Sequence, residues 1–156
     1  MKSSFESVLN FFEANEWKHE PNYENKTVES GMNCDNASLR IVVAVDSEYD
    51  LVQCIVPYQT KAPVAIRGEV AELICRINYG MRLGKYELDF SDGEIRFHLA
   101  SVINPDVITE EIVRRLVHTS FLTADKYYPA FMKVMFGVLT PEDAVNEVEG
   151  ERTATA

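Results

Sequence analysis

The sequence predicts a single α+β domain in which helices pack on one antiparallel sheet. Three observations indicate this class. With 156 residues and 46% hydrophobic composition, the chain suits one domain with a substantial core. Apolar residues recur at helical spacing in three segments and at strand spacing in five short runs. Turn-forming residues join neighbouring runs, which favours antiparallel pairing and the order α-β-β-β-α-β-β-α. We expect one domain over residues 1–149 and a disordered tail over 150–156.

The first helix is expected to begin at Ser3, because Ser3 and Glu6 match a capping box. Its apolar stripe comprises Phe5, Val8, Leu9 and Phe12. Residues 18–26 are polar, and the sequence leaves both a loop and an edge strand open there. The next three strand-like runs lie at about 27–34, 38–46 and 50–58. Short turns separate these runs, so an antiparallel meander is expected.

Two of these strands carry apolar residues on both faces. One face is predicted to carry a set of small apolar residues. This set comprises Val42, Ala44, Val52, Cys54 and Val56. A sheet with one solvated face would alternate apolar with polar residues, so we expect a covering layer on each face. The first helix and a second helix over about 64–79 would cover one face, and the long C-terminal helix part of the other.

A hairpin is predicted where residues 86–98 read YELDFSDGEIRFH. A two-residue Asp92-Gly93 turn would place Phe90, Leu88 and Tyr86 opposite Ile95, Phe97 and Leu99 in the core. The other face would pair Asp89 with Arg96 and Glu87 with His98. This charged row is expected to be a cross-strand ladder that helps to set the register, although its residue types also suit an acid/base or metal site.

A long helix is expected after Thr109, whose side chain would cap an acidic first turn. Its apolar stripe comprises Val113, Leu116, Val117, Ser120, Phe121, Ala124, Tyr128, Phe131, Met132 and Met135. Because this spacing continues across Pro129, we expect one kinked helix rather than two helices. Gly137 would end it, and Pro141 would stand in the first turn of a short terminal helix.

The charge of the chain argues against binding to nucleic acid or to anionic membranes. It has 25 acidic and 15 basic residues, a net charge of −10, and no basic run. Neither a signal-peptide core nor an 18-residue apolar run is present, so we expect a cytoplasmic protein. The three cysteines are spaced neither as a zinc site nor as a redox pair, and reduced, mostly buried thiols are expected. Phosphate-binding and nucleophile motifs are also missing, which predicts no cofactor, no metal and no enzyme activity.

Two segments resemble a known family. Residues 67–98 read RGEVAELICRINYGMRLGKYELDFSDGEIRFH, and they resemble the central block of the YbjN family, labelled bacterial sensory transduction regulators. Residues 125–149 read DKYYPAFMKVMFGVLTPEDAVNEVE, and they resemble the C-terminal block of its cyanobacterial-type members. The resemblance covers most of residues 3–149. It implies a cytoplasmic bacterial protein with the type III secretion chaperone-like fold, a scaffold on which relatives hold other proteins, often as dimers. It supplies no catalytic residues.

These observations predict a non-enzymatic protein-binding module, chaperone-like or regulatory, that works as a homodimer and binds an unidentified protein. Aromatic and Met side chains on more than one face of the long helix suit an adaptable interface as well as core packing. The candidate interface residues are Val42, Ala44, Val52, Tyr127, Tyr128, Phe131, Met132 and Phe136. The alternative is a small-ligand sensor or small enzyme that uses the strand faces at 86–98.

Overall fold

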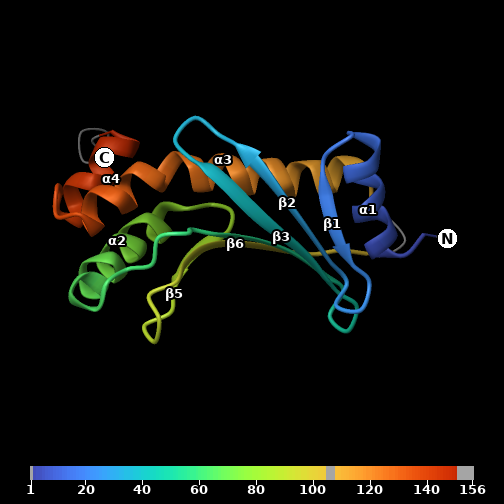
Figure 1. Cartoon of the computed structure of the whole chain (residues 1–156), viewed down its shortest axis with the longest axis horizontal. Coiled ribbons are helices and arrows are strands. Elements are labelled where there is room, and N and C mark those ends of the chain that lie inside the picture. Colours follow the sequence, from blue (N-terminus) through green and yellow to red (C-terminus); the bar gives the residue numbers. More distant parts are fainter. Residues whose placement is uncertain (1, 105–107, 151–156) are drawn as a thin grey trace.

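The computed structural model describes residues 2–104 and 108–150. Its helices are α1 (Ser4–Ala14), α2 (Arg67–Gly80), α3 (Glu110–Met135) and α4 (Pro141–Glu149), with a 3-10 turn, η1, at Val64–Ile66. Its strands are β1 (His19–Asn22), β2 (Thr27–Asn33), β3 (Ser38–Asp46), β4 (Leu51–Pro57), β5 (Lys85–Leu88) and β6 (Ile95–Val102). The α+β class, with one antiparallel sheet and packed helices, is confirmed (Figure 1). The predicted tail beyond Gly150 lies outside the described residues.

The sheet has six strands rather than the predicted five, in the order β1-β2-β3-β4-β6-β5. The additional strand is β1, which pairs antiparallel with β2 and places His19 opposite Ser30. Its sequence, HEPN, has no apolar alternation, because it lies at the edge of the sheet and three of its four residues are exposed. Pro21 suits this edge, since it has no backbone N–H to offer a further strand.

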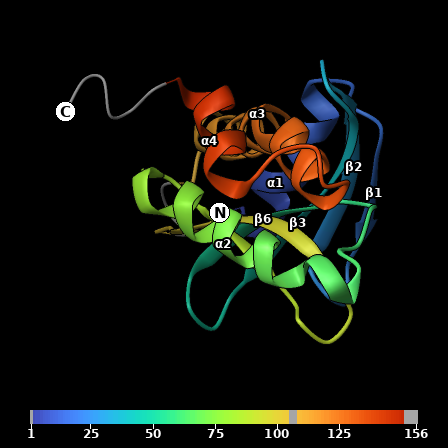
Figure 2. The same ribbon diagram turned by 90° about the vertical axis from the view of Figure 1, so that its left-hand side faces the viewer.

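The helices pack on the same side of the sheet. Along the length of the molecule, α3 contacts β3, β4 and β6, while α1 contacts β2 and β3, and α2 contacts β5 (Figure 1). In the view along the long axis, α3 and α4 lie on one side of β3 and β6 (Figure 2), and α2 contacts both of these helices. The predicted cover on both faces is therefore wrong, because α3 joins α1 and α2 instead of crossing to the opposite face.

The pairing of β3 with β4 corrects the predicted small apolar set. Val43 lies opposite Cys54, and Val42 lies opposite Ile55. Odd positions of β3 therefore share a face with even positions of β4. Val52, Cys54 and Val56 point toward the helices and are fully buried, whereas Val42 and Ala44 point away from them. The set was predicted from the alternation of side chains within each strand. Which side chains of β3 and β4 share a face also depends on the register, which the loop between the strands fixes.

The long helix is one helix that continues through Pro129, which confirms the predicted continuity. The Thr109 side chain accepts a hydrogen bond from the Ile112 N–H and caps its first turn. After the turn at Gly137, α4 folds back against α3 and α2. Thr140 caps α4 in the same way, by accepting from the Asp143 N–H, and Pro141 occupies the first helical position.

The β5–β6 hairpin has a longer loop than the predicted two-residue turn. Tyr86 lies opposite Phe97 and Leu88 lies opposite Ile95, so the loop spans residues 89–94. The register differs from the prediction by two residues. A shift of two keeps every side chain on its predicted face, but it changes every partner.

Contacts outside the two strands explain the longer loop. The Ala62 N–H donates to the Gly93 carbonyl at 2.8 Å, and Arg67 donates to the carbonyls of Ala62 and Phe90, both at 2.9 Å. Asp89 accepts from the Ser91 backbone N–H within the loop. Phe90, predicted to lie in the core, is therefore 60% exposed.

Asp125 in α3 anchors the turn between β2 and β3. Its carboxylate is buried and accepts from the backbone N–H groups of Asn36, at 2.8 Å, and Ala37, at 3.2 Å. The Asn36 side-chain amide donates to the Asp125 carbonyl at 3.1 Å. These bonds fix one end of the sheet to the middle of the long helix.

We expect Asp125→Ala to lower the free energy of unfolding by about 1–3 kcal/mol, because it leaves two partly buried backbone N–H groups without their acceptor. Asp125→Asn keeps one acceptor oxygen and should cost less. Urea denaturation of both variants checks this order. An alanine variant as stable as the wild type would show that water satisfies these groups and that the anchor adds nothing.

The cysteines differ from the expected mostly buried set. Cys54 is buried, Cys34 is intermediate and Cys75 is exposed on α2. Burial raises the pKa of the Cys54 thiol to about 12, which keeps it protonated and unreactive near neutral pH. Cys54 therefore behaves as the small core hydrophobe that the sequence suggested, Cys34 packs partly buried against the core, and Cys75 differs from the expectation.

Candidate protein interface

Three of the eight predicted interface residues lie inside the domain. Val52 and Phe131 are fully buried, and Tyr127 is nearly so. Val52 belongs to the helix-covered face of β4, while α4 and the sheet enclose the two aromatic residues of α3. The Tyr127 hydroxyl donates to the Glu149 carboxylate of α4 at 2.5 Å. These three residues cannot line an exposed surface of the folded chain, because the domain's own packing absorbs them.

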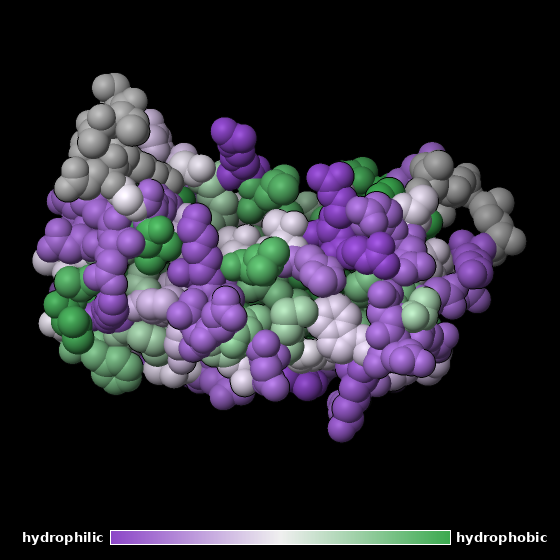
Figure 3. Space-filling model, turned by 90° about the horizontal axis from the view of Figure 1, so that it is seen from above, coloured by the Kyte–Doolittle hydropathy of each residue, from purple (hydrophilic) through white to green (hydrophobic). Residues whose placement is uncertain are grey.

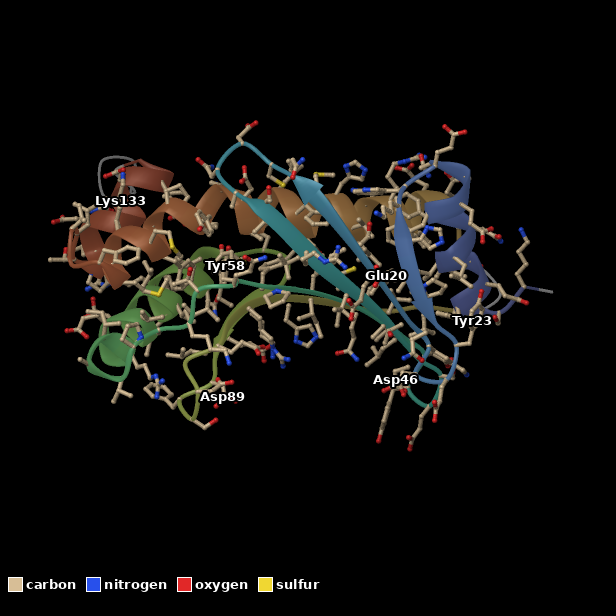
Figure 4. The ribbon with its side chains drawn as sticks, viewed as in Figure 1. Glu20, Tyr23, Asp46, Tyr58, Asp89 and Lys133 are labelled. Atoms are coloured by element: carbon tan, nitrogen blue, oxygen red, sulfur yellow. The ribbon has the colours of Figure 1, made fainter. Side chains whose placement is uncertain are left out.

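Phe131 belongs to an aromatic cluster in which two buried tyrosines are hydrogen bonded. The hydroxyls of Tyr58 and Tyr86 lie 2.9 Å apart, and Tyr58 donates to the Ala124 carbonyl at 2.6 Å. Figure 4 shows Tyr58 between the sheet and α3. Burial raises the pKa of both tyrosines well above the ordinary value. Both hydroxyls therefore stay protonated, and the network joins the sheet to α3 rather than forming a proton-transfer site.

The remaining predicted residues divide between two surfaces. Tyr128 and Met132 are half-buried along α3, and Phe136 at its C-terminal end is 72% exposed. Seen from the side of α3, apolar patches alternate with hydrophilic side chains and do not form one continuous stripe (Figure 3). Val42 and Ala44 lie on the face of the sheet that the helices leave open.

We call this surface the open sheet face. Its central residues are Val42, Ala44, Leu51, Gln53, Ile55, Pro57, His98 and Ala100. All of them except Ala100 are half-buried by their neighbours in the sheet, and no helix or strand among residues 2–104 and 108–150 packs over them. Charged side chains flank this centre. They are Glu29 and Arg40 on one side, and Lys85, Glu87 and Arg96 on the other. An apolar centre with a polar rim is the usual composition of a protein-binding surface.

Glu87 is the centre of the charged row that the sequence predicted. It accepts from Arg96 Nε at 3.0 Å, lies 3.0 Å from His98 Nδ1, and pairs with Lys85 at 3.5 Å. Its predicted partner was His98 alone, and Asp89 does not reach Arg96 but bonds to Ser91. Burial raises the pKa of Glu87, but Arg96, His98 and Lys85 outweigh this effect and hold it below its ordinary value.

This row lacks the arrangement of a catalytic site. Glu87 is ionised and already shared by three partners, and the other ring nitrogen of His98 lies 2.8 Å from Gln53 Oε1. A hollow of about 360 Å³ lies beside Glu87, Asp89 and Arg96. Among the described residues, no group of His, Cys, Asp and Glu side chains could hold a metal ion. The geometry favours a ladder of charges that fixes the two strands.

Replacing Glu87 with glutamine is expected to lower the free energy of unfolding by about 1 kcal/mol at neutral pH, and His98→Gln by no more than this, because partly exposed ion pairs are weak. The lowered pKa of Glu87 gives a sign to the pH dependence. Its contribution is present above its unfolded-state pKa and is lost as the pH falls through the lower folded-state value. Denaturation at several pH values should therefore show a smaller loss of stability in acid for Glu87→Gln than for the wild type.

Glu94→Gln is the matched control, since its carboxylate lies on the same hairpin and forms no ion pair within the part of the chain that the structure describes. It should keep the acid dependence of the wild type. A loss of several kcal/mol in either Glu87→Gln or His98→Gln would show that the row is more than a surface ladder.

Sequence reasoning did not find Ile55 and Gln53 as interface candidates. Grouping Val52, Cys54 and Val56 with Val42 placed Ile55 on the opposite face, because the loop at residues 47–50 was not used to align the strands. Its four residues fix the pairing of Asp46 with Leu51, and this pair alone would have placed Ile55 beside Val42.

Comparison with known proteins gives a family and a similar solved structure. A model of the family YbjN, described as "Putative bacterial sensory transduction regulator", matches residues 4–133. No curated protein matches the chain. A structure titled "Structure of the HopA1-SchA Chaperone-Effector Complex" contains a chain that is similar with a TM-score of 0.47 and 13% sequence identity. The similarity covers 76% of the present chain and 86% of the other. In the described residues, no helix is both long and apolar enough to cross a membrane.

Proposed function

The chain belongs to the YbjN family, and from this premise we propose that it is a non-enzymatic, cytoplasmic protein-binding module, regulatory or chaperone-like, that works as a homodimer. The sequence of residues 125–149 resembles the C-terminal block of cyanobacterial-type members, which supports placing the chain among them. The observation that carries the proposal is the open sheet face. Its half-buried apolar centre has no cover from the described chain, and such surfaces commonly mark protein interaction sites.

The family description names regulation of sensory transduction, and regulators of this kind act by binding other molecules. The charged row offers no free acid, base or nucleophile, which leaves binding as the role that the surface supports. The six-stranded sheet, backed by three helices, provides a rigid platform, and binding at a rigid surface loses little conformational entropy.

Site-specific photo-crosslinking in a bacterium that naturally produces the protein tests this proposal. A benzophenone amino acid replaces Ile55 on the open sheet face, and a second variant carries it in place of Leu122. Leu122 is the matched control, because it is an apolar residue of α3 that is 68% exposed on the helix side. The proposal expects covalent protein adducts from position 55 and few from position 122. Equal yields at the two positions, or no adducts at either, would contradict it.

A second candidate is a small-ligand sensor at the strand faces of residues 86–98, and the hollow beside Glu87 and Arg96 favours it. Arg96 could attract an anionic ligand, although Glu87 already pairs with it at 3.0 Å. Calorimetric titration with inorganic phosphate, acetate and divalent cations, on the wild type and on Glu87→Gln, separates the two candidates. Saturable binding that Glu87→Gln abolishes would support the sensor.

A further inference from the structure

The open sheet face is close to neutral on a strongly acidic chain. The chain carries 25 acidic and 15 basic residues. On the strands of the open sheet face, the acids are Glu20, Glu29, Asp46 and Glu87, and the bases are Arg40, Lys85 and Arg96. Asp89 and Glu94 lie beyond these strands, in the hairpin loop. Most of these charges are paired within the face: Arg40 with Glu29 at 3.6 Å, and Glu87 with Arg96 and Lys85. Two copies with a net charge of −10 each would therefore meet little charge repulsion at this face.

The strand registers place six residues of this face in one row across the sheet, and the first is Glu20 of β1, which pairs with Glu29. Glu29 pairs with Val42, Val42 with Ile55, Ile55 with His98, and His98 with Lys85. The row therefore begins with two acids, on β1 and β2, and ends with a base on β5. Ile55 of β4 stands between Val42 and His98, with Glu29 and Lys85 two strands away on either side. A row with opposite charges at its ends and an apolar centre is complementary to its own reverse.

We propose that a second copy of this chain covers the open sheet face, with a twofold axis running along β4. This proposal deepens the proposed function and rests on it. Such an axis reverses the row, so Glu29 faces Lys85 of the second copy at both ends. Ile55 meets its own counterpart at the centre, and Val42 meets His98. A twofold arrangement uses each contact twice and closes the assembly at two copies.

The same axis brings Arg40 near Arg96 of the second copy. Each arginine keeps a carboxylate in its own chain, Glu29 at 3.6 Å and Glu87 at 3.0 Å. At each end of the interface, Glu29 and Arg40 of one copy therefore lie beside Arg96 and Glu87 of the other, and their charges alternate in sign. Glu29 and Arg40 are about half exposed, so both can turn toward new partners. The pairing also removes Val42, Ile55 and Ala100 from water, which supplies the apolar part of the association.

Charge reversal of Glu29 and Lys85, the two residues that face each other across the proposed axis, tests this arrangement by sedimentation equilibrium. We expect Glu29→Lys and Lys85→Glu each to raise the dimer dissociation constant about tenfold, because each replaces attraction by repulsion at both ends. The double variant keeps the net charge of the wild type and should recover its dissociation constant to within about threefold. Glu13→Lys is the control, since it makes the same charge change on the exposed side of α1 and should not weaken the dimer.

Several outcomes would overturn the arrangement. A wild type that sediments as a monomer at high concentration would show that the chain does not form the proposed dimer. A dissociation constant that neither single reversal changes would contradict the pairing of Glu29 with Lys85. A double variant that dimerises more weakly than either single variant would contradict it as well. A dimer that Phe136→Glu dissociates while both reversals leave it intact would place the interface at the exposed end of α3 instead. Circular dichroism on each variant checks that the fold is kept.

The photo-crosslinked adducts distinguish this inference from the proposed function. An adduct of twice the chain mass, whose peptides come only from this protein, supports the second copy as occupant. An adduct with a different protein as the sole product from position 55 overturns the homodimer arrangement and leaves the protein-binding function standing. The absence of any adduct contradicts both.

Discussion

Replacing Phe97 with alanine is expected to lower the free energy of unfolding by about 3–5 kcal/mol. Phe97 is fully buried at the centre of β6. Its ring lies 5.4 Å from the ring of Tyr86, and it fills the space beside Gly84, where an added Cβ would approach the ring to 2.4 Å. The substitution removes apolar contacts and leaves a cavity that the surrounding aromatic cluster cannot close. Because domains of this size are stable by about 5–15 kcal/mol, the effect is a large share of the total.

Phe90 provides the matched control, because it is the same residue type on the same hairpin but is 60% exposed. Phe90→Ala should change the free energy of unfolding by less than about 1 kcal/mol. Chemical denaturation of the two variants therefore tests the register itself. The two-residue turn predicted from the sequence would place both rings in the core, so equal losses would support that register and contradict the one observed.

The hairpin shows how much of such an element a sequence can specify. Alternation correctly assigned Tyr86, Ile95 and Phe97 to the core and Glu87 to the other face, since the period of two is a property of each strand alone. The partners were wrong because Ala62 and Arg67, which lie outside the hairpin, hold the loop at residues 89–94. Contacts between distant segments leave no local pattern in the sequence.

The helices show the complementary case. The caps at Ser3, Thr109 and Thr140 and the continuation of α3 through Pro129 all depend on residues within a few positions of each other, and the structure contains each of them. The side of the sheet on which α3 packs depends on the whole chain. Its apolar stripe predicted that one face would be buried, but the stripe does not say against which surface. The predicted interface on Tyr127 and Phe131 was wrong for this reason.

The open sheet face follows from the same cause. Once α3 packs beside α1 and α2, no long element of the described chain remains to cover the outer side of Val42 and Ile55. The sequence indicates this surface, because β3 and β4 carry apolar residues at positions where a solvated strand would carry polar ones. The described chain provides no cover on this side, and in the arrangement proposed above a second copy provides it.

Replacing Gly93 with alanine is expected to lower the free energy of unfolding by about 2–4 kcal/mol, for two separate reasons. Gly93 has a φ of +85°, a conformation that side chains with a Cβ rarely adopt. An added Cβ would also lie 2.2 Å from the Ala62 carbonyl oxygen, so the loop would have to move away from the segment that anchors it. That movement would break the hydrogen bond from the Ala62 N–H to the Gly93 carbonyl.

Gly137→Ala separates the two reasons, because Gly137 has a φ of +71° but nothing lies within 4 Å of an added Cβ. It should lose only the conformational part, about 1 kcal/mol. The difference between the two variants, measured by urea denaturation, is the contribution of the close approach between the hairpin loop and residue 62. Equal losses would show that Ala62 does not fix the loop. The observed register would then need another cause, because the anchoring of this loop is what distinguishes it from the two-residue turn.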